Sequence, residues 1–246
     1  MARPEIDTHP HIFRFGYNSA TMRRAFLVLL LVVSVQPALL PQGKAVKPGS
    51  IISRWPIKTG LAPNTVIDKA GALISLADLL ALDPAAEKMS KQFEDALFPK
   101  SQGALFSDGQ IIRTRGYLRI VAGEPDGDYH VQITATPDTM ENSIVVEVPK
   151  DDAEFVSSAE LRGAVKTVRQ WIVTNLKTGD PTGRVVRMVH PVYVEVQGQL
   201  FFDAEHQSAM AKGVYRGKSI DHVQLPSKTC WEIHPVTRVV FAARPA

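Results

Sequence analysis

Residues able to bind metal ions or to carry acid–base chemistry gather in two parts of this sequence. The first is the segment EPDGDYH, residues 124–130, and the second comprises the later blocks FFDAEH, RGK and WEIHPV. Carboxylates combined with imidazoles suit Mn²⁺ or Zn²⁺, whereas carboxylates alone suit Ca²⁺ or Mg²⁺. We therefore predict one ligand-binding site formed by Asp126, Asp128, His130, Asp203, His206, Arg216, Lys218, Glu232 and His234. Within this set, the residues expected to hold a divalent cation are Asp128, Asp203, His206 and His234.

Each of these residues also has a purely structural explanation. Asp126-Gly127 is a common type I′ hairpin pair, because glycine accepts a positive φ. A histidine on a strand is usually only solvated, and a short basic cluster such as RGK usually forms a loop tip. The sequence has no established ligand spacing such as H-x-x-x-H, and no Gly-x-Ser-x-Gly, P-loop or dinucleotide fingerprint. The predicted site therefore depends on a fold that brings the separate blocks together.

The elements that must position these residues are mostly β-strands, because the second half of the chain alternates between apolar and polar residues. Asp126-Gly127 separates the first two alternating segments, and Pro149 ends the third. Ser157-x-x-Glu160 is a capping box, and apolar residues follow it at helical spacing. We predict strands at 110–125, 129–137, 142–149, 190–203 and 230–242, with a helix at 158–177.

Three strands, one helix and two further strands are the order of the OB-fold, a five-stranded Greek-key barrel. We therefore expect a mainly β protein with an OB-like barrel over 107–246 and its helix between strands 3 and 4; a β-sandwich is the alternative. In an OB-fold, the loops after strands 1 and 4 (L12 and L45) lie on the same side of the barrel. Here L12 is EPDGDYH, and L45 is the connection 204–230, which has no clear secondary structure. The predicted site lies at the mouth between them.

Strand alternation also predicts which way the polar side chains point. Asp128 and His130 fall on the polar side of the second strand, and Glu232 and His234 on the polar side of the fifth. Trp231 falls on the apolar side and is expected in the core. We therefore expect the four polar residues to face away from the core, towards the outside of the barrel.

The N-terminal region carries the sequence pattern of a signal peptide for export. Residues 1–45 are predicted to be an upstream extension and a signal peptide. The run MRRAFLVLLLVVSV begins at Met22, where two arginines precede an apolar stretch of signal-peptide length. Cleavage is expected after Ala45 or Ala38. The apolar stretch is shorter than the roughly 20 residues that span a bilayer, so we predict a periplasmic or secreted protein without a transmembrane span.

The region that follows, 46–106, contains several prolines and is predicted to form a helical hairpin with helices at 69–81 and 84–98.

The charge of the chain argues against a general affinity for nucleic acid. Of 28 basic and 25 acidic residues, 1–45 hold 5 and 2, which leaves 23 of each in the remainder. The single cysteine, Cys230, excludes an internal disulfide.

Six blocks in a fixed order resemble a group of uncharacterised exported bacterial proteins with an OB-like domain. They are RGYLRIV, DGDYHVQI, IVVEVP, VYVEVQGQLFFDAEH, RGK and WEIHPV, and they cover about residues 110–242. More distantly, the DGD turn and the segment VVEVPK resemble thermonuclease-type OB-fold nucleases, which carry such segments around a Ca²⁺ ion. This resemblance implies that Asp128 matches a metal-binding aspartate and that Glu147 takes the place of the second acid. Lys150 and Asn142 stand where those nucleases have a glutamate and an arginine.

Three functions remain open from the sequence. The first is an exported OB-fold binding module for an unknown ligand or an envelope protein partner, with its site at the mouth between L12 and L45 and a divalent cation as cofactor. The second is a metal-dependent, nuclease-like phosphodiesterase, in which a metal-activated water is the nucleophile. The third is a structural protein of the cell envelope.

Overall fold

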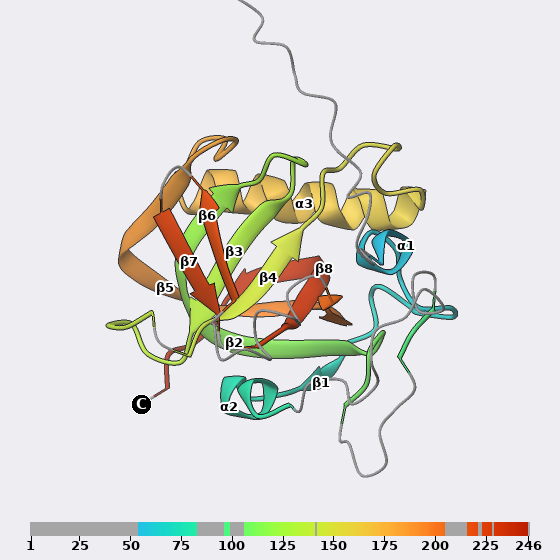
Figure 1. Ribbon diagram of the computed structural model, residues 1–246, viewed down its shortest axis with the longest axis horizontal. Helices are drawn as coiled ribbons and strands as arrows, with labels where there is room; N and C mark the ends of the chain where they lie inside the picture. The colour runs from blue at the N-terminus through green and yellow to red at the C-terminus, as the bar shows by residue number, and fades with distance from the viewer. Residues whose placement is uncertain are drawn as a thin grey trace, which may run out of the picture. The chain divides into compact units, whose positions relative to one another are not determined.

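A computed structural model describes residues 54–82, 96–98, 106–140, 142–204, 216–220, 223–227 and 229–245 (Figure 1). The chain divides into two compact units, Met1–Leu40 and Pro41–Ala246, and every described residue belongs to the second. The predicted signal peptide and most of the predicted helix at 84–98 lie outside the described residues. No helix within the described part of the chain is both long and apolar enough to cross a membrane.

Five strands close into a barrel, which confirms the predicted fold class. Neighbouring strands pair antiparallel except for β4 and β8, which pair in parallel, and β2 pairs with β5 to complete the circle. This is the strand order of an OB-like barrel. The strands are β2 (Ile111–Gly123), β3 (Tyr129–Thr134), β4 (Ile144–Val148), β5 (Val185–Phe202) and β8 (Trp231–Phe241).

One long helix, α3 (Ala159–Asn175), connects β4 to β5 and packs against β4 and β8 (Figure 1). Its N-cap is Ser158, whose side chain accepts a hydrogen bond from the Leu161 amide, rather than Ser157 as the capping-box pattern predicted. The buried stripe of α3 joins the apolar core inside the barrel. Trp231 belongs to this core and is 7% exposed, as predicted.

A segment that precedes the barrel covers part of its outer wall. It contains α1 (Trp55–Lys58), β1 (Ala72–Leu73) and α2 (Leu76–Leu80). The predicted helix over 69–81 is therefore wrong in its first half, because the chain pairs in parallel with β2 at Ala72 and begins a helix only after the N-cap Ser75. On β5, the side-chain amide of Gln197 donates to Ile67 O at 3.1 Å, and that of Gln199 donates to Ile57 O at 3.1 Å.

A second cover comes from the connection between β5 and β8, which was predicted to have no clear structure. It contains a hairpin of two strands, β6 (Arg216–Ile220) and β7 (Val223–Ser227). Leu225 of this hairpin packs on Ile120 and Ala122 of β2, and Ser227 Oγ donates to Ser143 O before β4. Figure 1 shows the hairpin in front of the barrel strands. The outer wall is thus covered from two directions.

Candidate metal centre on the outer wall of the barrel

The turn EPDGDYH brings two carboxylates to the start of β3. The amide of Glu124 donates to Asp128 O at 2.9 Å, and the amide of Gly127 donates to Glu124 O at 3.0 Å. Gly127 has φ +94, a conformation that favours glycine. The turn therefore holds Glu124 and Asp128 beside His130, the second residue of β3.

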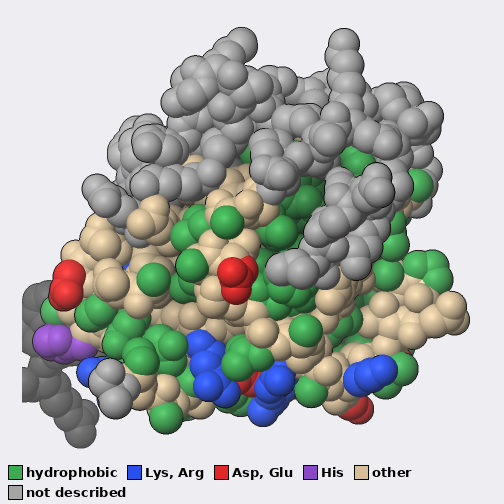
Figure 2. Space-filling view, turned by 90° about the horizontal axis from the view of Figure 1, so that it is seen from below, with side chains coloured by type: hydrophobic (Ala, Val, Ile, Leu, Met, Phe, Trp, Pro, Cys, Tyr) green, Lys and Arg blue, Asp and Glu red, His purple; other side chains and the backbone are tan. Residues whose placement is uncertain are grey.

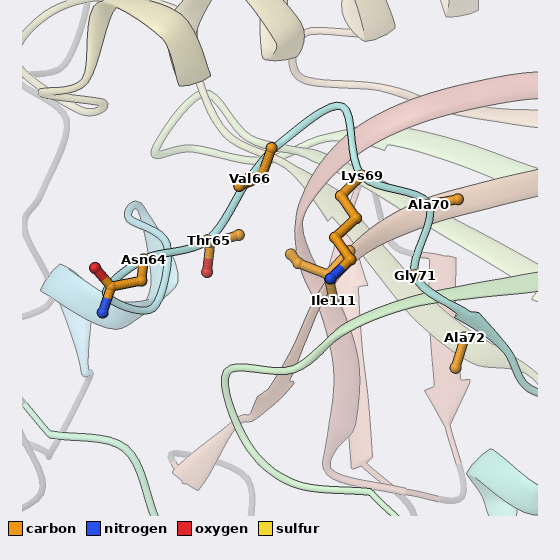
Figure 3. Close-up of a pocket in the computed structure, with 8 residues that line it drawn as sticks. All are labelled: Asn64, Thr65, Val66, Lys69, Ala70, Gly71, Ala72 and Ile111. Carbon is orange, nitrogen blue, oxygen red and sulfur yellow. The ribbon is translucent and has the colours of Figure 1, made fainter.

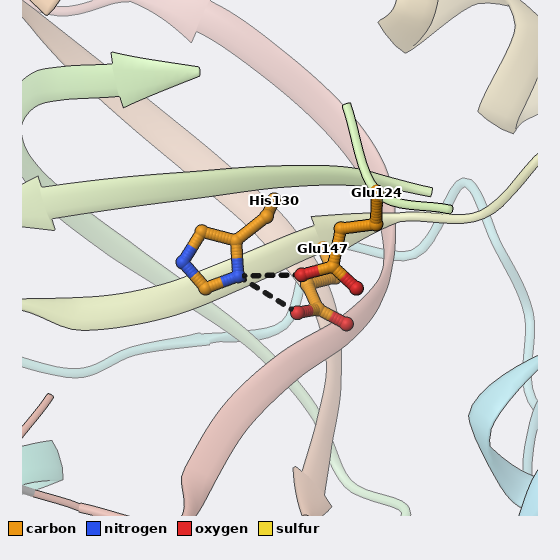
Figure 4. A group of neighbouring side chains, drawn as sticks. All are labelled: Glu124, His130 and Glu147. Atoms are coloured by element: carbon orange, nitrogen blue, oxygen red, sulfur yellow. Dashed lines mark hydrogen bonds and ion pairs between the residues drawn. The ribbon is translucent and has the colours of Figure 1, made fainter. Parts of the chain in front are cut away.

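Strand register adds a third acid, because His130 of β3 is paired directly with Glu147 of β4. Nδ1 of His130 lies 3.0 Å from Glu147 Oε1 and 3.2 Å from Glu124 Oε1 (Figure 4). The ligand atoms of these three residues all lie within 4.8 Å of one another. Burial lowers the pKa of His130, but its hydrogen bonds to both carboxylates outweigh burial and raise it overall.

The parallel pairing of β4 with β8 brings in a second histidine. Nδ1 of His234 lies 3.0 Å from Glu147 Oε2 and 3.4 Å from Glu232 Oε2, and its Nε2 lies 3.6 Å from Asp128 Oδ2. Asp128, Glu147 and His234 again place their ligand atoms within 4.8 Å of one another. Glu147 therefore belongs to two groups, one through each of its oxygens.

Lys58 of α1 supplies the ammonium that faces these acids. Its Nζ lies 3.3 Å from Glu147 Oε2 and 3.8 Å from Asp128 Oδ2. Burial lowers the pKa of Lys58, but the surrounding carboxylates together raise it well above its ordinary value. We use the name acid–histidine cluster for Lys58, Glu124, Asp128, His130, Glu147, Glu232 and His234. Among the described residues, the cationic groups that face its four carboxylates are Lys58, His130 and His234.

Burial and these partners shift the protonation of the cluster. Burial raises the pKa of Asp128 to about 7, although Lys58 opposes this. Burial would also raise the pKa of Glu147, but Lys58 and the hydrogen bonds from the two histidines hold it well below its ordinary range. Burial lowers the pKa of His234, but its hydrogen bonds to Glu147 and Glu232 raise it to about 9. The cluster thus competes for a small number of protons.

The arrangement around His234 is one that metal sites use. A metal-binding histidine usually donates its other ring N–H to a carboxylate, which fixes the tautomer. His234 Nδ1 faces Glu147 and Glu232, which leaves Nε2 turned towards Asp128 Oδ2. Among the described residues, neither His234 Nε2 nor Asp128 Oδ2 has a hydrogen-bond partner, and both residues are fully buried. Their separation of 3.6 Å is close to the roughly 3.0–3.5 Å between two ligands of an ion bound at about 2.0–2.2 Å.

The structure brings together four of the nine predicted site residues. Asp128, His130, Glu232 and His234 come together on the side of the strands that faces away from the core, but at most 1% of each is accessible. The N-terminal segment and the β6–β7 hairpin cover the wall on which they lie.

The other predicted residues are placed differently. Asp126 accepts a hydrogen bond from the Asp128 amide at 3.2 Å and so braces the turn. Asp203 follows β5, its amide donates to Cys230 O, and its carboxylate belongs to neither group of candidate ligands. His206 lies outside the described residues. Arg216 and Lys218 lie on β6, of which only the backbone is described.

Three members of the cluster, Lys58, Glu124 and Glu147, are absent from the predicted site. Glu124 opens the segment EPDGDYH, so its proximity to Asp128 could have been inferred from the turn. Lys58 had no signal in the sequence, because its partner Glu147 lies far along the chain. Glu147 itself was indicated only by the resemblance to thermonuclease-type proteins.

Two other features of the surface lack this combination of acids and histidines. A hollow of about 320 Å³ lies along the chain before β1, and the described residues that line it include one ionisable side chain, that of Lys69 (Figure 3). Lys and Arg side chains also gather beside a few acidic ones on the face seen from the side of α2 (Figure 2). Neither feature brings together groups with the chemistry of the acid–histidine cluster.

The fold and the site define an OB-like barrel that carries a buried cluster of carboxylates, imidazoles and one ammonium on its outer wall. Comparisons with protein-family models, curated proteins and solved structures found no match to this chain.

Proposed function

We propose that this protein is an exported OB-fold binding module that takes up a divalent transition-metal ion on the outer wall of its barrel. Asp128, Glu147 and His234 are the ligands. The observation that carries the proposal is the meeting of Asp128 Oδ2 and His234 Nε2, both buried and both without a hydrogen-bond partner among the described residues. The export of the protein is supported by the signal-peptide pattern that begins at Met22.

The donor set favours Mn²⁺ or Zn²⁺ over Ca²⁺. Ca²⁺ takes six to eight oxygen ligands, whereas this site pairs two carboxylates with an imidazole nitrogen. Glu232 lies beside Nδ1 of His234, the ring nitrogen that faces away from Asp128, where carboxylates commonly orient a metal-binding histidine.

Calorimetric titration of the chelator-treated full chain tests this function. Mn²⁺ or Zn²⁺ should bind at least tenfold more tightly than Ca²⁺. At an ion concentration of about 100 times Kd, binding should add about 2.7 kcal/mol to the free energy of unfolding. Asp128→Asn should lose this stabilisation. The matched control is Asp152→Asn, because Asp152 is an exposed aspartate that pairs with Lys150 and should leave binding unchanged. Equal binding by wild type and Asp128→Asn would contradict the proposal.

A second function, metal-dependent phosphodiester hydrolysis, is favoured by one observation. Asp128 and Glu147, the two residues that match acids of thermonuclease-type proteins, lie in the same group of candidate ligands. A bound ion would lower the pKa of a water and supply the nucleophile. Assays of the Mn²⁺-loaded chain on single-stranded DNA and on an activated phosphodiester test this activity. Hydrolysis that persists in Glu147→Gln would assign the activity to a contaminant.

A further inference from the structure

The ammonium of Lys58 faces the two carboxylates of the candidate metal centre. It contacts Glu147 Oε2 and Asp128 Oδ2, and these are the carboxylate oxygens nearest to His234 in the candidate metal centre. We propose that Lys58 is the selectivity residue of this site: its ammonium holds the cation position until a divalent ion displaces it. This inference rests on the proposed metal binding. It adds that the Lys58 ammonium competes with the metal ion for the same carboxylates.

The backbone around Lys58 is anchored on both sides. Arg54, which is fully buried, forms an ion pair with Asp108 just before α1. The side chain of Gln199 donates to Ile57 O, immediately before Lys58. These contacts fix the Cα atom of Lys58 against the barrel, so only its flexible side chain can leave the acids.

The Lys58 side chain can move from the carboxylates towards solvent. Lys58 is 15% exposed, whereas Asp128 and Glu147 are at most 2% exposed and are held by their strand and turn. Lysine has a flexible four-carbon stem and a strongly hydrated ammonium, so an outward rotation places the charge in water. The carboxylates stay in position and can then accept another cation.

Charge explains why this exchange would select divalent ions. A tethered group competes at an effective concentration in the millimolar range or above, so a dissolved ion must bind better than the ammonium does. Na⁺ or K⁺ replaces one positive charge with another and gains nothing in Coulomb energy. A divalent ion doubles the attraction to Asp128 and Glu147, and a transition metal also gains the nitrogen of His234.

Affinity measurements on four forms of the full chain test the inference. Lys58→Met keeps the length of the side chain and removes the competitor, so the Kd for Mn²⁺ should fall at least tenfold. Lys58→Arg keeps a positive charge and should not tighten binding. The matched control is Lys150→Met, because Lys150 pairs with exposed Asp152 and its removal should change the Kd by less than about twofold. Circular dichroism of each variant confirms folding.

A measurement on the wild type avoids any effect of substitution on folding. Amine acylation followed by peptide mass spectrometry reports how accessible each lysine is. Saturating Mn²⁺ should raise acylation of Lys58 severalfold and leave Lys150 unchanged. NaCl at matched ionic strength should leave both unchanged.

The outcomes separate this inference from the function on which it rests. If the wild type binds Mn²⁺ but Lys58→Met binds no more tightly, and Lys58 acylation does not rise, the inference is overturned while metal binding stands. If Lys58→Met binds Mn²⁺ and the wild type does not, Lys58 blocks the site but no divalent ion displaces it, so both the proposed exchange and metal uptake by the wild type are overturned. If neither form binds the ion, both proposals are overturned.

Discussion

Among the described residues, two buried carboxylates on the outer wall of the barrel each face three cationic groups, and these groups differ in their exposure to water. Glu147 on β4 faces Lys58, His130 and His234, whose side chains are 15%, 2% and 0% exposed. Glu195 on β5 faces three arginines, and two of them are about half exposed. These arginines are Arg113, Arg115 and Arg238. Both carboxylates therefore face three cationic groups, but the groups around Glu147 are shielded from water and those around Glu195 are not.

The cover decides what each arrangement can do. Around Glu195 the guanidinium groups reach water, which screens the attraction, and their hydrogen bonds lower the pKa of Glu195 against the effect of burial. Around Glu147 the N-terminal segment excludes water, so each unpaired charge is expensive and pKa values move far from their ordinary ranges. We infer that burial, rather than the number of charges, makes the acid–histidine cluster the candidate site.

The largest expected effect comes from neutralising the buried carboxylate. Glu147→Gln leaves Lys58, His130 and His234 without their shared partner in a dry environment. We expect the free energy of unfolding to fall by about 3–5 kcal/mol in a urea titration of the metal-free protein. A loss below about 1 kcal/mol would show that water reaches the cluster, and the contrast with Glu195 would then disappear.

The pH dependence of stability gives the second test. Burial raises the pKa of Asp128 from 3.8 to about 7, and hydrogen bonds raise that of His234 from 6.5 to about 9. A pKa raised by folding means that the folded state holds the proton more tightly. The contribution of each group to the free energy of unfolding is therefore complete at a pH below its pKa in the unfolded chain. It is lost as the pH rises through the group's pKa in the folded protein. The melting temperature of the metal-free protein should fall between about pH 5 and pH 9.

Variants assign this fall to its sources. Asp128→Asn should remove most of the decrease below about pH 7 and keep the decrease above it, where His234 loses its proton. The exposed control Asp152→Asn should keep the whole profile. Glu147 opposes the trend at low pH, because its lowered pKa contributes stability that is lost as pH falls. A profile that is flat from pH 5 to pH 9 in the wild type would contradict the buried network.

The smallest effect is expected at the exposed counterpart. Glu195→Gln removes the acid shared by three arginines, but these remain solvated, so we expect a loss of about 0.2–1 kcal/mol. The loss should shrink further in 1 M NaCl, where salt screens exposed charges. Equal losses for Glu195→Gln and Glu147→Gln would remove the distinction between the two regions.

Much of the barrel could be predicted because strand periodicity is local. The alternation of polar and apolar residues placed all five strands, and it assigned Trp231 to the core and His130, Glu232 and His234 to the opposite face. Element boundaries were less predictable: β5 begins at Val185 rather than near 190, since exposed residues at its start hide the pattern. The short β1 was missed because a two-residue strand has no period.

The sequence by itself determined the order of the five barrel strands, the turn at Gly127 and the side of the strand on which His130, Glu232 and His234 lie, because these follow from neighbouring residues. It did not reveal the register shift in β2 between Leu118 and Ile120, after which Val121 rather than Ile120 joins the main core. Only the tertiary structure decided that the polar face is buried, since its cover comes from α1 and from a hairpin between β5 and β8. The same is true of the pairing of Lys58 with Glu147. Alternation records which side of a strand a residue occupies, but packing between distant segments decides whether that side meets water.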